Sequence, residues 1–360
     1  MTCSWKPNWE ETRQHFIDWW HQEGLVLNVW NAPELDNPHE IFANPGEALD
    51  IEYFYTQPEW RARWNHYNLS RQNFIADTLP VSVTNTGPGS LALFMGSEAG
   101  LSTETVWFEP CIDPADPESH PPLRLDIENR WWRITEELLR TSVDLAQVNY
   151  LVGCPDLIEN IDIVAALRDP QLLLMDMIDR PDWVIEKVWE VNEVYFAAYD
   201  KIYDIIKLED GSSCFGAFRL WGPGKTAKVQ CDTSAMFSPR MLRKFVIPAL
   251  TAQCEWLDYS MYHLDGHQCI RHLDAILEID ALDAIEWTPD PQVQQGGDPA
   301  WYPMYRKILE AGKSMQAIGV KGNEVEPLLD AVGGKGLYIQ TTVKNETEME
   351  RLLIKVEPYR

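Results

Sequence analysis

The sequence predicts an α/β fold, specifically a closed (β/α)8 TIM barrel that follows an N-terminal extension of helical and irregular structure. Its 360 residues are an ordinary length for one such barrel. Short apolar segments alternate with longer helical patterns, and this alternation is typical of a parallel sheet. An open, doubly wound sheet is the alternative, but no Gly-x-Gly-x-x-Gly or Walker sequence follows the first strand to favour it.

The predicted extension covers residues 1–75 and packs on a barrel of residues 76–360. Aromatic-rich residues 9–20 and residues 57–76 are expected to be helices, and the Pro/Asn-rich residues 31–45 a loop. Eight short apolar segments are the expected barrel strands: 79–84, 147–152, 214–221, 228–232, 260–264, 282–287, 314–318 and 336–341. The expected helices among and after them cover 124–144, 158–167, 171–178, 181–206, 239–257, 269–277, 301–310, 324–331 and 346–356. Pro181 is a good start for the longest of these helices.

Charge and composition exclude several classes of partner. The chain has 30 basic and 56 acidic residues, and the resulting net charge of −26 disfavours nucleic acid and anionic membranes. No apolar stretch approaches the roughly 18 residues of a membrane span, and the first residues lack a signal-peptide pattern. Seven scattered cysteines without a CxxC pair indicate free thiols in the cytoplasm. We therefore expect a cytoplasmic protein with a small-molecule substrate, either a monomer or a homodimer.

Candidate site residues are the polar and aromatic residues at the predicted strand ends, because the carboxyl ends of barrel strands form the usual active-site face. The candidates for substrate contact are Asn85, Gln230, Asp232, Trp287, Gln340 and Thr341. Trp287 could instead pack as a barrel lid, and Asp232 could be a turn residue. A separate metal cluster of His267, Cys269 and His272 is conceivable, although such residues more often cap and pack helices.

His263 and Asp265 are the strongest pair. Residues two apart in a strand face the same side, so the imidazole and the carboxylate can enter one pocket. There they could act catalytically by sharing a proton, or they could hold a metal ion. The other reading is a His–Asp pair that closes a tight turn before a helix.

Four short motifs resemble the uroporphyrinogen decarboxylase superfamily. The run Gln-Cys-Asp-Thr-Ser-Ala-Met-Phe-Ser-Pro-Arg-Met-Leu at 230–242 resembles its strand end and helix start, and Tyr-His-Leu-Asp-Gly at 262–266 resembles its next strand end. Asn-Thr-Gly-Pro-Gly at 85–89 looks like the loop after its first strand, and Arg-Pro-Asp-Trp-Val at 180–184 like a helix start. The order and spacing of these motifs agree from about residue 75 onward. The resemblance implies an α/β barrel with its site at the mouth.

The superfamily includes uroporphyrinogen decarboxylases and corrinoid- or thiol-linked methyltransferases, and the resemblance is closer to the methyltransferase branch. The decarboxylase run Arg-Gln-Ala-Gly-Arg is absent, and residues 11–15 read Glu-Thr-Arg-Gln-His. The family's zinc site would fall on His263, Asp265 and residues 340–342, where its two thiolates are replaced. The resemblance thus implies zinc or another divalent metal at His263 and Asp265, and a corrinoid supplied by a carrier protein.

Three functions follow as hypotheses. The first is a corrinoid-linked methyltransferase-type enzyme acting on a small organic substrate. The second is a carboxy-lyase for a carboxylated substrate, with uroporphyrinogen III as the extreme case. Arg219 and Lys225 are the cations that could assist such a reaction. The third is a barrel that binds a ligand without turning it over.

Overall fold

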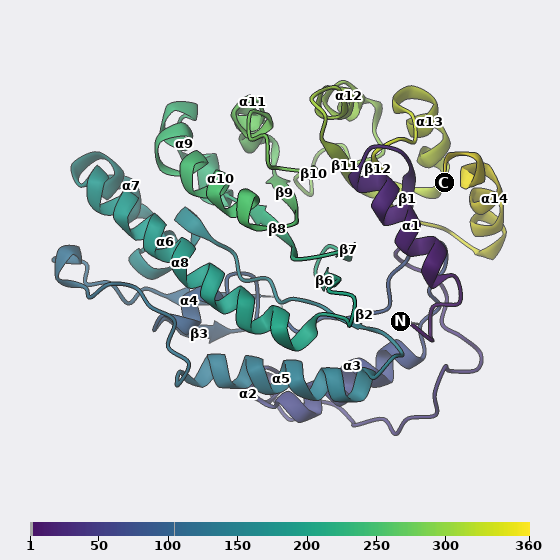
Figure 1. Cartoon of the computed structure of the whole chain (residues 1–360), viewed down its shortest axis with the longest axis horizontal. Coiled ribbons are helices and arrows are strands. Elements are labelled where there is room, and N and C mark those ends of the chain that lie inside the picture. The colour runs from purple at the N-terminus through teal and green to yellow at the C-terminus, as the bar shows by residue number, and fades with distance from the viewer. Residues whose placement is uncertain (1–2, 104) are drawn as a thin grey trace.

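A six-stranded parallel sheet forms the larger part of the barrel (Figure 1). The computed structural model describes residues 3–103 and 105–360. The strand order in the sheet is β1-β12-β11-β10-β9-β8, and every neighbouring pair is parallel. These strands are β1 (Leu25–Val29), β8 (Thr226–Gln230), β9 (Tyr259–Asp265), β10 (Ala284–Thr288), β11 (Ser314–Lys321) and β12 (Leu337–Thr342). The predicted α/β class with a parallel sheet is therefore confirmed.

Shorter segments complete the ring between β1 and β8. The backbone N–H of Asp77 donates to Leu27 in β1 at 2.8 Å, and this segment leads into β2 (Val81–Ser82). Strand β2 pairs in parallel with β5 (Leu151–Val152). Beyond β5, Cys154 bridges to Phe215 in a small hairpin of β6 (Ser213–Phe215) and β7 (Leu220–Gly222). Finally, the N–H of Thr226 in β8 donates to the Ser213 hydroxyl at 3.2 Å.

Two strand predictions were wrong. Strand β1 lies in the stretch predicted as an extension, yet it is a full member of the sheet beside β12. All five of its residues are buried, so its sequence lacks the alternation that marks a half-buried strand. The segment 214–221, predicted as one barrel strand, is instead the antiparallel β6–β7 hairpin. Arg219 turns this hairpin with a positive φ of 51°, which the apolar pattern did not reveal.

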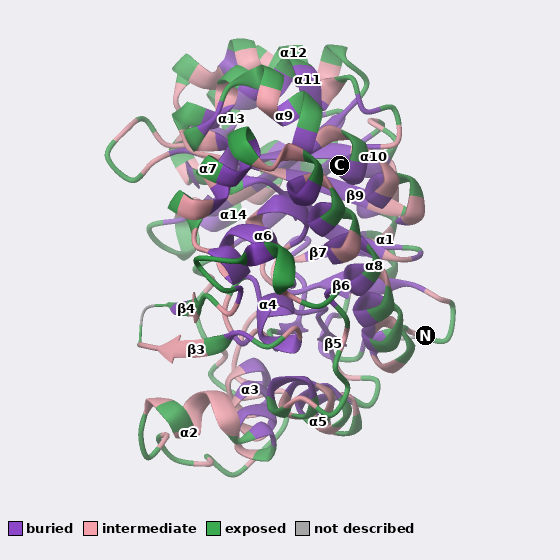
Figure 2. Cartoon of the chain, turned by 90° about the vertical axis from the view of Figure 1, so that its left-hand side faces the viewer, coloured by how far each residue is buried: buried purple, intermediate pink, exposed green. Residues whose placement is uncertain are grey.

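Helices cover the outer face of the barrel, with exposed residues on their outer sides and buried residues toward the strands (Figure 2). Their bounds are α1 (Trp9–Trp20), α2 (Ile51–Thr56), α3 (Pro58–Ser70), α4 (Leu91–Phe94), α5 (Arg130–Ala146), α6 (Asn160–Arg168), α7 (Pro170–Asp179), α8 (Pro181–Ile206), α9 (Pro239–Phe245), α10 (Ile247–Trp256), α11 (Leu273–Leu277), α12 (Tyr302–Glu310), α13 (Gly322–Val332) and α14 (Glu346–Val356). The predicted helix at 239–257 is divided, because Pro248 has no N–H to donate to the preceding turn. None of the described helices combines the length and apolarity needed to cross a bilayer.

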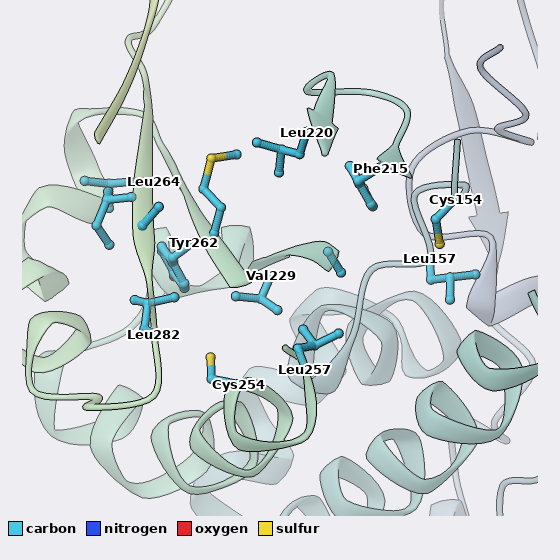
Figure 3. Packing of buried hydrophobic residues seen from close by; sticks show 14 of the residues in the cluster. Cys154, Leu157, Phe215, Leu220, Val229, Cys254, Leu257, Tyr262, Leu264 and Leu282 are labelled. Carbon is cyan, nitrogen blue, oxygen red and sulfur yellow. The ribbon is translucent and has the colours of Figure 1, made fainter. Parts of the chain in front are cut away.

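The apolar core lies between the strands and these helices. Val229, Tyr262 and Leu264 belong to β8 and β9, and Figure 3 shows them on the side of the strands where Cys254 and Leu257 also lie. All five residues are buried. Because side chains alternate along a strand, Gln230 and His263 point the other way, into the barrel.

Helix α1 closes the amino end of the barrel. Its Trp19 indole donates to the carbonyl of Met315, and its Trp19 carbonyl accepts from the Ser314 hydroxyl, both at the start of β11. Phe16 and Trp19 lie edge-on to Tyr338, with ring centroids 5.6 and 5.5 Å away. We call Trp9, Phe16, Trp19, Trp221 and Tyr338 the lower aromatic cluster.

A second hairpin lies beside the loop that follows β2. Strands β3 (Glu98–Leu101) and β4 (Val106–Glu109) pair antiparallel. Val106 and Phe108 pack onto Gly87 and Gly89, where an added Cβ would lie 2.6 Å from the Val106 Cβ and 2.9 Å from the Phe108 ring. Both glycines have positive φ, so the residue type is required by the turn as well as by the contact.

Candidate functional site

A row of polar side chains crosses five neighbouring strands inside the barrel. The strand register pairs Gln230 with His263, His263 with Glu286, Glu286 with Gln316, and Gln316 with Tyr338. These five residues, here called the polar row, share the interior face because paired residues point to the same side of a sheet. Glu286 and Gln316 are completely buried, so the interior of this barrel is polar at this level.

The β6–β7 hairpin covers part of this row from within. The carbonyl of Phe218 accepts a hydrogen bond from the Gln316 amide at 3.2 Å, and the carbonyl of Arg219 accepts from the Tyr338 hydroxyl at 3.1 Å. The Phe218 ring lies 5.0 Å from the His263 ring. The hairpin therefore shields His263 from water on one side.

Asp232, His263 and Asp265 meet directly above the polar row, at the carboxyl ends of β8 and β9. One ligand atom of each residue lies within 4.8 Å of the others. We call this trio the Asp-His-Asp cluster. All three were predicted to lie at strand ends on one face of the barrel, and the structure brings them together.

Glu286 fixes the orientation of His263. Its carboxylate is hydrogen bonded to His263 Nδ1, and its second oxygen accepts from the Thr288 hydroxyl at 2.7 Å. This bond leaves Nε2 as the ring nitrogen that can face a ligand. Burial alone would lower the pKa of His263, but the Glu286 carboxylate, with a further contribution from Asp232, raises it above the usual value.

Asp162 supports Asp232 from α6. Its carboxylate accepts the backbone N–H groups of Asp232 at 2.8 Å and of Thr233 at 2.9 Å. The Gln230 amide donates to Asp232 Oδ2 at 2.7 Å. Part of the Asp232 residue is exposed, but its carboxyl group lies among other acids. Burial and the charge of Asp162 raise the pKa of Asp232 to about 7.

Lys228 is a fully buried cation beneath the cluster. Its ammonium group lies 2.7 Å from an Asp156 oxygen and also donates to the side-chain carbonyl of Gln230. Burial would lower its pKa, but Asp156 and Glu159 raise it above the usual value. Because lysine only donates, it directs the Gln230 amide nitrogen toward Asp232.

The other predicted site residues lie elsewhere. Asn85 is a support between loops, since its oxygen accepts the N–H of Asp156 at 2.7 Å. Trp287 is fully buried and packs on Trp301 at 4.8 Å, so it does not line the mouth. The alternation along β10 explains this outcome, because its neighbours Glu286 and Thr288 take the interior positions.

Residues at the end of β12 also remain outside the cluster. Gln340 is half-buried and lies opposite Asn28 of β1, whereas Thr341 is buried on the other side of the strand. No described contact joins either residue to Asp232, His263 or Asp265.

The second group of candidate metal ligands does not converge. His267 is exposed and bonded to Asp290 at 2.6 Å, whereas Cys269 contacts the Ser234 hydroxyl. His272 is buried and bonded to the Ser234 carbonyl at 2.9 Å. These residues fit the alternative given above, in which they cap and pack the start of a helix.

Sequence reasoning missed Glu286, Lys228 and Asp162 as site residues. A signal was present for the first two, because each is a charged residue between two apolar ones within a predicted strand. Lys228 stands between Ala227 and Val229, and such a charge must face a polar interior or a partner. Asp162 gave no comparable signal, since acidic residues are common near helix starts.

The donor set of the Asp-His-Asp cluster fits a divalent metal ion. Two carboxylates and one imidazole provide three ligands, leave coordination positions open, and suit Zn²⁺ or a harder ion. The Glu286–His263 bond matches the carboxylate–histidine pairing that commonly orients a metal-binding imidazole. Among the described residues no thiolate joins the cluster, and burial raises the pKa of the adjacent Cys231 thiol far above its usual value.

Comparison with known proteins gives a fold relationship. No protein-family model matches the chain, and a search of curated proteins finds no significant match. Among solved structures, a methyltransferase from Methanosarcina mazei superposes with a TM-score of 0.62 at 10% identity, covering 96% of this chain and 97% of that chain. A B12-independent methionine synthase from Shewanella sp. W3-18-1, in complex with selenomethionine, covers 92% and 95% at 11% identity, but its TM-score of 0.44 is too low to support an argument.

The predicted TIM-barrel fold is confirmed by this first superposition, which extends over almost the whole of both chains. The chain thus has the fold that its motifs predicted through their resemblance to the uroporphyrinogen decarboxylase superfamily.

Proposed function

We propose that this protein is a metal-dependent enzyme of the methyltransferase type that acts on a small organic substrate at the barrel mouth. One observation carries the proposal: Asp232, His263 and Asp265 present ligand atoms within 4.8 Å of one another at the carboxyl ends of two strands. The fold shared with the Methanosarcina mazei methyltransferase supports the reaction class. The seven free cysteines are in keeping with a cytoplasmic enzyme.

Each residue has a distinct role in this proposal. Asp232, His263 and Asp265 hold Zn²⁺ or another divalent ion, which when bound supplies a Lewis acid for a substrate heteroatom. Glu286 keeps His263 Nε2 directed at the ion, while Gln230 orients the Asp232 carboxyl. A corrinoid on a separate carrier protein is the proposed methyl partner, following the resemblance to the methyltransferase branch.

Decarboxylation of a carboxylated substrate has less support. Lys225, one of the nominated cations, pairs with Asp200 at 2.7 Å before the start of β8. Arg219, the other, lies over the Trp30 ring at 4.5 Å. Lys228 is near the cluster, but it is fully buried and paired with Asp156. These positions leave no evident cation for several substrate carboxylates among the described residues of the mouth.

Metal analysis of the purified protein tests the central claim. We expect about one divalent ion per chain in the wild type and loss of most of it in His263→Ala. His267→Ala is the matched control, because His267 also pairs with a carboxylate but lies outside the cluster. Equal metal content in all three proteins, or none in the wild type after reconstitution with Zn²⁺, Mn²⁺ and Co²⁺, would overturn the metal assignment.

Methyl transfer tests the reaction class. The metal-loaded protein would be incubated with a corrinoid protein in its Co(I) state and a panel of methylated amines, thiols and ethers. Methylcobalamin formation, followed by its absorption spectrum, should depend on His263 and not on His267. Transfer at background rates across the panel would count against a methyltransferase, whatever the metal content.

A further inference from the structure

A pocket of about 370 Å³ opens beside the Asp-His-Asp cluster. Its walls are mainly apolar and come from the loop after β2, strand β4, helix α6 and the end of β8. The apolar and small lining residues are Pro88, Gly89, Val106, Trp107, Phe108, Pro110, Ile158, Ile163, Ala165, Ala166 and Pro170. Its polar end is formed by Asp162, Gln230, Asp232 and Thr233, so the pocket reaches the cluster through Asp232.

Packing of the β3–β4 hairpin fixes one wall of the pocket. Val106 and Phe108 rest on Gly87 and Gly89, which hold the hairpin against the loop after β2. Trp107 faces the other way across its partner Gly100, where any side chain would collide with the indole. The Phe108 ring lies on the side toward the loop, and it is only half-buried. A large aromatic residue that is ordered yet partly in water gains apolar contact when a ligand covers it.

The charge of the pocket restricts what can bind. The ionisable residues that line it are Asp162 and Asp232, and no described lysine or arginine does so. Asp162 already accepts from the N–H groups of Asp232 and Thr233. An anionic substituent would therefore lose its hydration without gaining a cation, and it should bind more weakly than a neutral one.

We propose that this pocket is the subsite for an uncharged apolar substituent of the substrate, and that Phe108 is its specificity-determining residue. The inference rests on the proposed function, because it places the reacting end of the substrate at Asp232. It names the substrate class as a small organic molecule with a neutral, ring-sized apolar group. Polycarboxylated substrates are excluded from this subsite by its charge.

Three probes of one size and different charge test the subsite: benzyl alcohol, benzoate and benzylamine. Saturable binding of each would be measured by ligand-observed NMR, with crystals soaked in benzyl alcohol to locate it. We expect benzyl alcohol to bind, and Phe108→Ala to weaken it about tenfold through lost apolar contact. Trp189→Ala removes a half-exposed aromatic ring from α8, outside the pocket, and should leave the affinity unchanged.

A second variant, which fills the pocket, keeps the test valid if Phe108→Ala misfolds. Ala166→Phe adds bulk on the opposite wall and should also abolish benzyl alcohol binding, with a circular dichroism spectrum like that of the wild type. Unchanged affinity in both variants, or benzoate binding as tightly as benzyl alcohol, would refute the subsite. Tighter binding of benzylamine would also refute it, in favour of a cation site.

His263→Ala separates this inference from the proposed function. The substitution should reduce the metal content while leaving benzyl alcohol binding intact, because His263 belongs to the Asp-His-Asp cluster but does not line the pocket. If the wild type binds no metal and transfers no methyl group but still binds the probe, the proposed function fails and the subsite stands. If metal and methyl transfer are found without probe binding, the subsite alone fails.

Discussion

Glu159 shows how far a single buried group can depart from its behaviour in water. One of its oxygens accepts the backbone N–H of Gln230, and the other is buried without a described partner. Burial raises its pKa to about 8 even though Lys228 opposes the change. The folded chain therefore keeps a proton on this carboxyl at neutral pH, whereas the unfolded chain releases it near the ordinary value of 4.5.

This difference predicts a pH-dependent effect of Glu159→Gln. Between pH 4.5 and about 8 the folded chain binds more protons than the unfolded one, so the free energy of unfolding falls as pH rises. The stabilisation by the retained proton is complete below pH 4.5 and is lost as pH rises through about 8. The glutamine cannot titrate, so its stability relative to wild type should improve by about 2 kcal/mol between pH 6 and pH 8. Urea unfolding at both values measures this, with exposed Glu193→Gln as the control. A pH-independent difference would contradict the raised pKa.

Lys228 gives a second prediction at this scale. Lys228→Met leaves Asp156 and the Gln230 carbonyl buried without their cation, which should cost about 3–5 kcal/mol of unfolding free energy. Lys307→Met is the matched control, since it breaks an exposed pair with Asp274 and should cost about 1 kcal/mol or less. Equal losses in urea unfolding would show that the buried pair is no more important than a surface one.

Residue placement could be predicted from the sequence where topology alone determines it. Asp232, His263 and Asp265 meet because parallel strands bring their carboxyl ends to one face. The expected position of Trp287 was wrong because adjacent residues of a strand point to opposite faces, and Glu286 and Thr288 occupy the interior face. Lys228 and Glu286 were missed because most residues in their strands are apolar, so the strands were predicted to be apolar throughout. The residues that bind these two charged side chains lie far along the chain.

At the scale of elements, the β3–β4 hairpin depends on the glycines of the loop beside it. Gly87→Ala adds a Cβ that would lie 2.6 Å from that of Val106, at a residue with φ of +85°. We expect it to destabilise the fold by about 1 kcal/mol from the backbone alone and by more from the collision. Gly46→Ala is the control, because Gly46 has φ of +81° but no atom within 4 Å of an added Cβ.

Two measurements test the hairpin, one of global stability and one of local opening. Thermal unfolding should show a larger loss for Gly87→Ala than for Gly46→Ala, and limited proteolysis should cut near residues 98–109 sooner. If the two alanine variants behave alike, the hairpin is not held by this contact.

Element boundaries were predicted well where a local signal defines them. Helices α8 and α14 have the predicted bounds, 181–206 and 346–356, and each has such a signal. Pro181 begins the first, and Asn345 caps the second by accepting the N–H of Glu348 at 2.9 Å. Strand β1 was missed because its partner β12 lies more than 300 residues away, which no local pattern encodes. The β6–β7 hairpin was missed although its strands are close in sequence, because the turn residue Arg219 is not of a type that marks a turn.

For the whole molecule, the ring is continuous in its hydrogen bonds from β1 through β12 to β8 and relies on short segments elsewhere. Native-state hydrogen exchange should therefore be slowest in β9–β12 and markedly faster in β2, β5 and the two hairpins. Mass spectrometry of peptides from residues 259–342 and 79–109 measures the difference. Uniform protection of both regions would contradict this unequal stability around the ring.

The barrel as a whole was predictable because the alternation of strands and helices is repeated along the chain. Errors in single strands do not change this overall pattern. Strand β1, predicted to be part of the extension, belongs to the sheet beside β12, and the segment 214–221 contributes a hairpin instead of one strand. The alternation was therefore predicted correctly, while these two segments were not. Net charge and strand order do not show which polar residues lie side by side inside the barrel. The register between neighbouring strands determines this, and the register comes from the structure.

The lower aromatic cluster has a kinetic consequence. Because α1 packs across the start of β11 at the amino end of the barrel, an ion reaches the Asp-His-Asp cluster from the carboxyl end, where these three residues lie. A ligand in the pocket beside Phe108 would lie next to Asp232 at that end. A chelator would then have to wait for the ligand to leave, so occupancy of the apolar pocket should slow the removal of a bound ion without changing how tightly the three side chains hold it.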